Sequence, residues 1–589
     1  MSTERPTLAP PGIERPTMDV DIVCAGFGPA TGGFLTTLTR GLPLEDGTLP
    51  QVMCYERAGD IGFGVSGVVT RARGIRASFP ELNPGEIPMA APVREEKVLY
   101  LLDPIGASRR SFTLRSADSL LRAAGVLDHE AFELPLIPAF LEKHDGLVMS
   151  IGQFNQWVGQ QIMMSGLAQI WPGMPVAAPL IEGQRVAGVQ LLDHELQPGM
   201  EIKAALTVVG DGPVGPVGRQ LDEHFGMPEG HEKREWAVGM KMVIDLPEGS
   251  PLEPGMVLHS FGYPEPEIFG FFYVHPGNVA SAGIFVPSWF DSPVRTTYRY
   301  LQHFLLHPYL WRYLEGGRLR SWGAKTLNEA GRRGEPHLVG DGWARIGEGS
   351  GSTNVLTGSG VDEAWTTGTQ LGEAVLELLR ENKPFTKENL EATYVRRRRA
   401  SWLEQESLTA EKSRDGFHRG IVAGMLGMAL AGFSHGRLHI PGAPIDHMPK
   451  VEDFFSERIP AARVDEIRRE AASSGKPLHD ALMDAWGWPA IPFDGQLLVT
   501  HQDALLMGGK VQAAPGYADH VAFRDAALCA SCGGKTCVSV CSGQALTDAP
   551  ERPAFDREKC IHCGACMWNC ERENVVFMAG AGGLHSAEN

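Results

Sequence analysis

The chain has 589 residues, of which 43% are hydrophobic and 8% aromatic, so it can form several domains with a substantial core. Its net charge of −18 argues against a nucleic-acid partner. The 70 glycines and 42 prolines favour a loop-rich α/β or α+β fold over a helical bundle. No apolar run reaches the ~20 residues of a membrane-spanning helix, and polar, proline-rich residues 1–17 are expected to be a disordered extension without a signal peptide.

The first predicted elements are a strand, a glycine-rich turn and a helix. Residues 20–25 form a buried strand by their apolar run, and residues 34–38 are an apolar helix. Between them lie four candidate cofactor-binding residues: Gly26, Gly28, Thr31 and Gly32. Glycines in such a turn let the backbone approach a pyrophosphate at the helix N-terminus, although Thr31 stands where a third glycine is usual. A second strand, residues 52–56, ends at Glu56, whose carboxylate is suited to a ribose hydroxyl.

Further glycine-bearing turns extend this pattern. Residues 61–67 form a flexible loop, residues 206–212 and 338–342 each predict a strand that ends at an acidic turn, and residues 363–380 predict a helix. The candidate residues in and beside these turns are Ser66, Gly67, Gly210, Asp211, Gly340, Asp341, Gly358 and Gly360. A carboxylate at such a strand end can accept from a ribityl chain, and a helix start favours a reduced flavin anion. Four such patches in this order predict FAD.

The stretches between these turns are rich in predicted strands. Aromatic runs such as residues 268–273 indicate a second domain that packs over the flavin, while a helix over 154–164 returns to the first domain. We expect a Rossmann-like FAD-binding domain of residues 18–75, 150–225 and 330–400, with an inserted β-rich quinone or substrate domain of residues 76–149 and 226–329. The fold class is thus α/β combined with α+β.

A short uncharged segment, residues 421–433, follows the arginine run 396–399. Its flanking basic residues are His418, Arg419, His435, Arg437 and His439. The segment is too short to span a bilayer, and glycines and methionines between cationic anchors favour a helix that dips into one leaflet over a buried core helix. The arginine run is either a solvated face or a contact with anionic lipid. We expect a membrane-associating segment over 400–445 and a helical linker over 446–500.

Eight of the ten cysteines lie in the last 61 residues, as C-x2-C-x4-C-x3-C and, 18 residues later, C-x2-C-x2-C-x3-C. In such runs the cysteine after x3 ligates the other cluster. The pattern predicts a ferredoxin-like domain of residues 501–589 with two [4Fe–4S] clusters, one on Cys541, Cys560, Cys563 and Cys566 and one on Cys529, Cys532, Cys537 and Cys570. The first set is the surer, because the x4 spacing is unusual. Zinc or disulfides are the alternatives, which interleaved runs and a reducing compartment disfavour.

From Asp19 onward the chain resembles the electron-transfer flavoprotein–ubiquinone oxidoreductase family of FAD and iron–sulfur proteins. The most specific stretches are LEGG at 314–317, GAKTLNEAG at 323–331 and DGQ at 494–496. Residues 421–433 fall where that family dips a helix into the membrane. The family usually holds one cluster, so the set that contains Cys529 is additional, and its Gly-Thr beside the flavin reads Gly360-Val361 here.

The resemblance implies an electron relay with no protein nucleophile or general acid at the flavin. Electron-transfer flavoprotein or a ferredoxin-like donor would dock near the clusters, and a quinone would enter beside the apolar segment at the cytoplasmic face of the inner membrane. Asn328 matches a family residue near the flavin ring, which implies a flavin-tuning role. The alternatives are a ferredoxin-dependent geranylgeranyl or isoprenoid double-bond reductase and an electron-relay subunit of a larger complex. Which quinone is used, and in which direction electrons flow, stays open.

Overall fold

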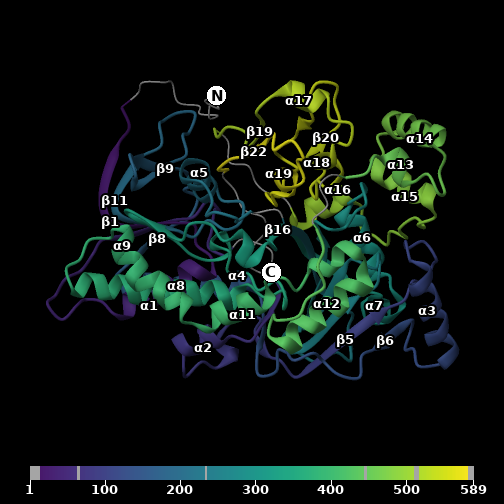
Figure 1. Cartoon of the computed structure of the whole chain (residues 1–589), viewed down its shortest axis with the longest axis horizontal. Coiled ribbons are helices and arrows are strands. Elements are labelled where there is room, and N and C mark those ends of the chain that lie inside the picture. Colours follow the sequence, from purple (N-terminus) through teal and green to yellow (C-terminus); the bar gives the residue numbers. More distant parts are fainter. Residues whose placement is uncertain (1–13, 63–66, 233–234, 444–447, 510–515, 581–589) are drawn as a thin grey trace.

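The computed structural model describes residues 14–62, 67–232, 235–443, 448–509 and 516–580, and two large sheets dominate it (Figure 1). The first sheet has the order β17-β18-β11-β1-β2-β8, with β10 and β9 continuing from β11. Its strands are β1 Thr17–Ala25, β2 Val52–Tyr55, β8 Gln169–Trp171, β9 Val176–Glu182, β10 Arg185–Leu191, β11 Glu201–Val209, β17 Val339–Gly340 and β18 Trp343–Arg345. The five central strands β18, β11, β1, β2 and β8 are parallel.

This parallel sheet is buried on both faces. The second half of β1, Ile22 to Ala25, is fully buried, as a strand covered from two sides requires. Helices α1 (Pro29–Arg40) and α8 (Val361–Arg380) pack together closely, because a Cβ on Gly33 would lie 2.5 Å from the carbonyl oxygen of Trp365. A Cβ on Gly368 would lie only 1.8 Å from the carbonyl oxygen of Ala30. The Rossmann-like arrangement predicted from the first turn is therefore present.

The second sheet has seven strands in the order β16-β12-β15-β14-β13-β5-β6, and only its β13–β5 pair is parallel. The strands are β5 Glu95–Leu101, β6 Ala131–Glu133, β12 Trp236–Asp245, β13 Met256–Phe261, β14 Phe269–His275, β15 Val279–Pro287 and β16 Arg318–Asn328. Between the sheets lie β3 Val68–Thr70, β4 Ala91–Pro92 and β7 Leu147–Met149. Helices α6 (Thr297–Leu305) and α7 (Pro308–Leu314) join β15 to β16 and bury their aromatic residues in the same core.

Shorter helices complete the two-sheet body. Their bounds are α2 Arg73–Ser78, α3 Phe112–Ala124, α4 Ile151–Ser165, α5 Pro216–Phe225, α9 Lys387–Leu390, α10 Arg396–Arg399, α11 Trp402–Ala410 and α12 Ile421–Ser434. Within the described residues, no helix combines the length and the apolar character needed to cross a bilayer.

The C-terminal part begins with the linker helices and ends with short elements around the cysteines. The elements are α13 Val451–Phe454, α14 Ala461–Ser474, α15 Leu478–Trp486, α16 His501–Ala504, β19 Val521–Phe523, α17 Ala526–Ala530, α18 Thr536–Ser539, β20 Leu546–Thr547, β21 Ala554–Phe555, α19 Ala565–Trp568 and β22 Val575–Phe577. In Figure 1 the yellow cysteine region lies at the top of the view, the green linker helices α13, α14 and α15 lie at its right, and α12 lies below.

Two sequence expectations need correction here. The extension expected to be disordered over 1–17 is ordered at its end: β1 begins at Thr17, and the Arg15 Nη2 donates to Asp193 at 2.8 Å. Residues 1–13 lie outside the described part of the chain. The arginine run 396–399 is neither fully solvated nor free for lipid, because Arg398 is buried and bonds Ser350, while Arg399 pairs with Glu335 and Glu404.

Candidate redox site

The first glycine turn lies at the carboxyl edge of the parallel sheet and is open to a ligand. Gly26 has φ +86°, and a Cβ there would lie 2.8 Å from the carbonyl oxygen of Gly210. Thr31 replaces the third glycine of the pattern, and its hydroxyl donates to the Gly26 carbonyl at 2.8 Å. Gly28 is the N-cap of α1 with no side-chain cap, and a Cβ on it would meet nothing within 4 Å. The uncapped helix start and the free space above Gly28 fit a pyrophosphate.

Glu56 is brought to this turn, as predicted. It follows β2, and its carboxylate accepts hydrogen bonds from the backbone N–H groups of Phe27, at 2.8 Å, and Ala58, at 2.9 Å. The Glu56 carboxylate therefore lies beside Phe27, the residue before Gly28. A ribose bound next to the pyrophosphate would contact this carboxylate. Gly32, by contrast, contributes to packing, since a Cβ there would lie 3.2 Å from the Trp365 ring.

Two predicted acids do not face this opening. The Asp211 carboxylate accepts from the backbone N–H groups of Val217, at 2.9 Å, and Gly218, at 3.0 Å, so it fixes the start of α5. Asp341 is in the turn between β17 and β18. This turn comes before β18, the strand that runs toward the cofactor edge. It accepts from the Lys387 N–H at 2.8 Å. Residues 338–342 form a hairpin corner at the start of β18, away from the cofactor edge, so the predicted cofactor roles of Gly340 and Asp341 gain no support from this geometry and stay predictions.

The acid that follows the cofactor-side end of β18 is Glu348, whereas the sequence pattern had suggested Asp341 for this position. Glu348 lies three residues beyond the end of β18, is half-buried, and accepts from the Asn328 N–H at 2.8 Å. Burial raises the pKa of Glu348 to about 7, against the lowering effect of that N–H and of Lys325. The same Gly-acid-Gly pattern occurs at 340–342 and 347–349, so a signal for Glu348 was present in the sequence as well.

The surroundings of Glu348 hold it rigidly. The Arg398 guanidinium donates to the Ser350 hydroxyl at 2.7 Å and to its carbonyl at 2.8 Å, fixing the turn that carries Glu348. Asn328 is buried, and its side-chain oxygen accepts from the Ala330 N–H at 3.0 Å. Its predicted flavin-tuning role is untested, but it lies directly beside Glu348.

The remaining predicted flavin-side residues are near the second sheet. Gly360 is the N-cap of α8, and a Cβ on Gly358 would meet nothing within 4 Å. The carbonyl of Gly67 accepts from the Lys241 ammonium at 2.5 Å. Ser66 lies outside the described residues. The uncapped start of α8 and the acid at Glu348 therefore fit the ribityl and ring end of a flavin dinucleotide.

The eight C-terminal cysteines fall into the two sets that the spacing predicts. Burial raises the pKa of Cys566. Of the other cysteines, Cys541, Cys563 and Cys560 of the same set add more to this increase than any cysteine of the other set. Burial likewise raises the pKa of Cys537 to about 12, and of the other cysteines Cys570, Cys532 and Cys529 add most to this increase. We call the Cys541, Cys560, Cys563 and Cys566 set the inner group and the Cys529, Cys532, Cys537 and Cys570 set the outer group.

The donors around both groups suit bound thiolates. The N–H groups of Ala545 and Asn574 each donate to a cysteine sulfur, Cys541 and Cys570 respectively, at 3.2 Å, and the Asn574 amide donates to Cys529 at 3.0 Å. All cysteines are free thiols. Within the described residues, no three His, Cys, Asp or Glu side chains converge closely enough to hold a single metal ion.

The inner group lies against the nucleotide site. The Thr326 N–H on β16 donates to the Cys563 carbonyl at 3.0 Å, and a Cβ on Gly564 would lie 2.4 Å from the Val214 side chain, just beyond Asp211. Lys325 is half-buried, and desolvation lowers its pKa to about 8, while the nearby charges of Glu348, Cys563 and Glu56 raise it. Glu56 and Glu348 mark the two parts of the dinucleotide site, so the inner group is adjacent to both.

Comparisons with known proteins agree with this arrangement. The family model described as ETF-QO, ubiquinone-binding, matches residues 236–327, which include β12 to β15 and nearly all of β16. The electron transfer flavoprotein-ubiquinone oxidoreductase of Pseudomonas aeruginosa is 24% identical over 97% of this chain and 99% of its own length. A probable enzyme of the same name from Acinetobacter baylyi is 26% identical, over 62% of this chain and 63% of that protein.

Among solved structures, a geranylgeranyl bacteriochlorophyll reductase-like protein from Thermoplasma acidophilum aligns with a TM-score of 0.48 and 13% identity, over 80% of this chain and 100% of that one. A likeness of this degree says nothing about a substrate. The sequence relatives carry the assignment, and the resemblance deduced from residues 314–331 and 494–496 is confirmed. The chain is an oxidoreductase related to the electron transfer flavoprotein-ubiquinone oxidoreductases.

Proposed function

We propose that this protein passes electrons from electron-transfer flavoprotein, or from a ferredoxin-like donor, through two [4Fe–4S] clusters and FAD to a membrane quinone at the cytoplasmic face of the inner membrane. The observation that carries the proposal is the position of the inner cysteines. Cys563 is hydrogen-bonded to β16 through its carbonyl, and Lys325 on the same strand interacts electrostatically with both Cys563 and Glu348. A cluster there would be next to a flavin held by Gly28, Glu56 and Glu348.

The burial of the two cysteine groups supports an order of electron flow. Three of the four inner cysteines are buried and Cys541 is partly exposed, whereas in the outer group Cys529 and Cys537 are buried and Cys532 and Cys570 are partly exposed. Clusters carry one electron at a time and FAD carries one or two, so a flavin is the natural junction before a two-electron quinone. The more exposed outer group would receive electrons from the donor, and the more buried inner group would hand them on.

The acceptor side of the proposal rests on α12. Its buried residues, Ile421 and Met428 among them, pack against Trp289, Phe417 and Leu356. Its other face is exposed and apolar: Val422 is 55%, Leu426 54% and Phe433 83% exposed. Arg419 and Arg437 are exposed at the two ends, whereas His418 is turned inward to Glu235 at 3.4 Å. An exposed apolar helix between cations is suited to the interface of a bilayer.

A second helix, α3, extends this apolar surface. Phe140 contacts α12 at Gly432, and Leu114 of α3 packs against the same apolar cluster. Phe112 and Leu120 of α3 are exposed. We call the exposed residues Phe112, Leu120, Val422, Leu426 and Phe433 the apolar face.

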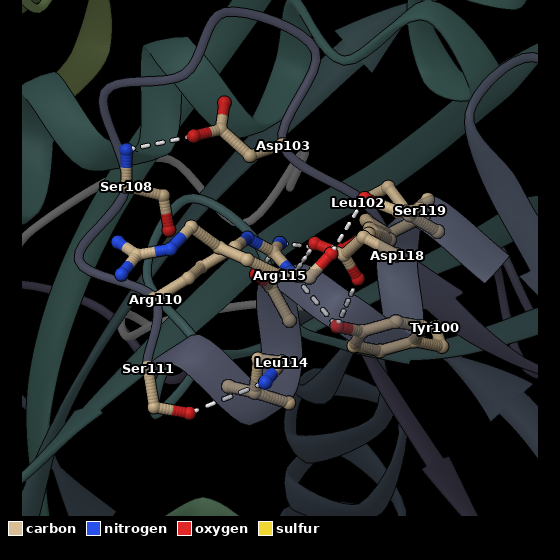
Figure 2. Close-up of polar contacts among 12 residues, drawn as sticks. Tyr100, Leu102, Asp103, Ser108, Arg110, Ser111, Leu114, Arg115, Asp118 and Ser119 are labelled. Atoms are coloured by element: carbon tan, nitrogen blue, oxygen red, sulfur yellow. Dashed lines mark hydrogen bonds and ion pairs between the residues drawn. The ribbon is translucent and has the colours of Figure 1, made fainter. Parts of the chain in front are cut away.

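The attachment of α3 is polar, because its one buried residue is Asp118. Asp118 accepts from Arg110 at 2.9 Å and from the Tyr100 hydroxyl at 2.7 Å, as Figure 2 shows. The Arg110 guanidinium also donates to the carbonyls of Leu101, at 3.0 Å, and Gly262, at 2.5 Å. This buried pair fixes α3 while its apolar side chains stay exposed.

The double variant Leu426→Asp/Phe433→Asp is expected to bind liposomes at least about 10²-fold more weakly than the wild type. Each large apolar side chain that leaves water contributes roughly 1.5–3 kcal/mol, and two added carboxylates oppose insertion. Flotation with liposomes that contain anionic lipid measures the change. Leu196→Asp is the matched control, since Leu196 is equally exposed but lies on the turn between β10 and β11. Equal binding of the double variant and the control would contradict the membrane role of α12.

Anaerobic turnover tests the proposal as a whole. The holoenzyme is mixed with enzymatically reduced electron-transfer flavoprotein and a short-chain quinone, and quinone loss is followed. Rapid quinone loss that requires both proteins is expected. Flavin and clusters that dithionite reduces, but that give no quinone loss with this donor or with a reduced ferredoxin, would refute the proposed reaction.

A further inference from the structure

A two-stranded ribbon in the cysteine region carries a buried polar residue at each of its ends. Strands β19 and β22 are antiparallel, with Val521 opposite Phe577, so the residues that precede the two strands lie at opposite ends of the ribbon. These residues are His520, which is 5% exposed, and Asn574, which is 1% exposed. Each places a side-chain nitrogen against a cysteine sulfur, and the two cysteines belong to different groups.

Asn574 contacts the outer group. Its Nδ2 donates to the Cys529 sulfur at 3.0 Å and to the Asp525 carbonyl at 2.7 Å. The orientation of the amide is fixed, because its Oδ1 accepts from the Asp525 N–H at 2.8 Å. The Asn574 backbone N–H donates to the Cys570 sulfur at 3.2 Å. This one residue therefore donates to both the first and the last cysteine of the outer group.

His520 contacts the inner group. Its Nε2 lies 3.1 Å from the Cys560 sulfur. A thiolate that binds iron carries no proton, so the imidazole must be the donor when a cluster is bound. The ring stacks on His562, with 4.4 Å between the ring centroids, and makes edge contacts with Phe555 and Phe577. These contacts hold the imidazole N–H toward the sulfur.

The two groups differ at matching positions of their cysteine runs. Four residues after the last cysteine of each run, a backbone N–H donates back to that cysteine at 3.2 Å, from Ala545 to Cys541 and from Asn574 to Cys570. Asn574 adds a side-chain amide at this position, whereas Ala545 has none to offer. The inner group is instead contacted by His520, from outside both runs, so the two groups receive side-chain donors of different chemistry.

Donors of this kind act on the electron affinity of a cluster. A cluster becomes more negative when it is reduced, and an N–H that points at one of its sulfurs stabilises the added charge. Each donor therefore raises the reduction potential of the cluster that it contacts. The His520 imidazole favours an electron on the inner cluster, whereas the Asn574 amide favours an electron on the outer cluster.

We propose that His520 and Asn574 together set how an electron divides between the two clusters. This inference rests on the part of the proposed function that assigns a four-iron cluster to each cysteine group. One electron leaves the outer cluster and one arrives at the inner cluster, with no bond formed or broken and no proton moved. Because the two donors act on opposite sides of this equilibrium, loss of one shifts it in the opposite direction from loss of the other.

The test measures both reduction potentials by anaerobic redox titration followed by electron paramagnetic resonance. His520→Phe keeps an aromatic ring and removes the N–H. It is expected to shift the reduction equilibrium of the inner cluster about tenfold toward the oxidised form, which is about 59 mV for one electron. Asn574→Ala is expected to shift the outer cluster in the same way. In protein that holds a single electron, the inner population is expected to fall in His520→Phe and to rise in Asn574→Ala.

Three further variants make the measurement specific. His520→Gln keeps an N–H close to the position of Nε2 and is expected to restore most of the wild-type potential. Phe555→Leu removes a ring contact of His520 but no hydrogen bond, so both potentials are expected to stay at their wild-type values. Cys532→Ala removes an outer cysteine, and the signal that remains in this variant identifies the inner cluster.

The outcomes separate this inference from the proposed function. Wild-type potentials in His520→Phe and Asn574→Ala, with both clusters bound, would overturn the inference alone. Equal shifts of both clusters in either variant would also overturn it, because that pattern indicates a general loosening of the cysteine region. The expected opposite shifts, in a protein whose wild type gives no quinone loss, would support the inference and refute the proposed reaction. A wild-type protein that binds no iron would refute both.

Discussion

Cys563→Ala is expected to abolish electron transfer to quinone and to remove roughly half of the bound iron, one of two four-iron clusters. Cys563 belongs to the inner group, it is buried, and its carbonyl accepts a hydrogen bond from β16. Loss of one thiolate leaves a cluster with an incomplete, water-accessible iron, which is unstable. Iron and sulfide analysis, electron paramagnetic resonance of the reduced protein and the quinone assay measure the effect.

Two further variants sharpen this expectation. Cys54→Ala removes a fully buried cysteine that belongs to neither group, and it is expected to retain all iron and full turnover. Cys532→Ala, in the outer group, is expected to lose a similar share of iron but to keep reoxidation of the reduced flavin by quinone. If Cys563→Ala kept both its iron and its activity, the assignment of the inner group would be wrong.

The cysteine sets and the first nucleotide turn could be predicted from sequence because both are set by local spacing. Four thiolates at x2 and x3 intervals, or Gly26 and Gly28 between a strand and a helix, restrict the geometry wherever the rest of the chain goes. The absence of the third glycine is also explained by local contacts. The Thr31 hydroxyl donates to the Gly26 carbonyl, and Gly33 allows the close approach of α1 to α8.

Which acid lies at the cofactor edge depends on sheet topology, which local spacing does not fix. Residues 338–342 and 346–349 present the same strand-and-acid pattern, and the β17–β18 hairpin places Glu348, rather than Asp341, beyond the end of β18. The Asp211 carboxylate likewise bonds the start of α5, a contact that the sequence pattern does not reveal.

Gly28→Asp is expected to prevent FAD binding without unfolding the protein. Gly28 has φ −126° and ψ −170°, which other residues adopt freely, and an added side chain meets no protein atom within 4 Å. The new carboxylate would cap α1, which stabilises a helix by a few tenths of a kcal/mol relative to glycine. It would also fill the space above Gly28 with a negative charge, where a pyrophosphate must approach.

The predicted loss of affinity follows from that charge. Repulsion between a carboxylate and a phosphate about 4 Å apart costs roughly 1–4 kcal/mol at a protein surface, and steric exclusion adds to it, so FAD binding is expected to weaken by about 10²-fold or more. The purified variant should be colourless in the flavin bands, carry normal iron, and unfold at the wild-type apoprotein temperature or slightly above it. Gly85→Asp, at an exposed position in a short helical turn, is the control. A Gly28→Asp protein that retained FAD through dialysis would show that the dinucleotide does not bind at the start of α1.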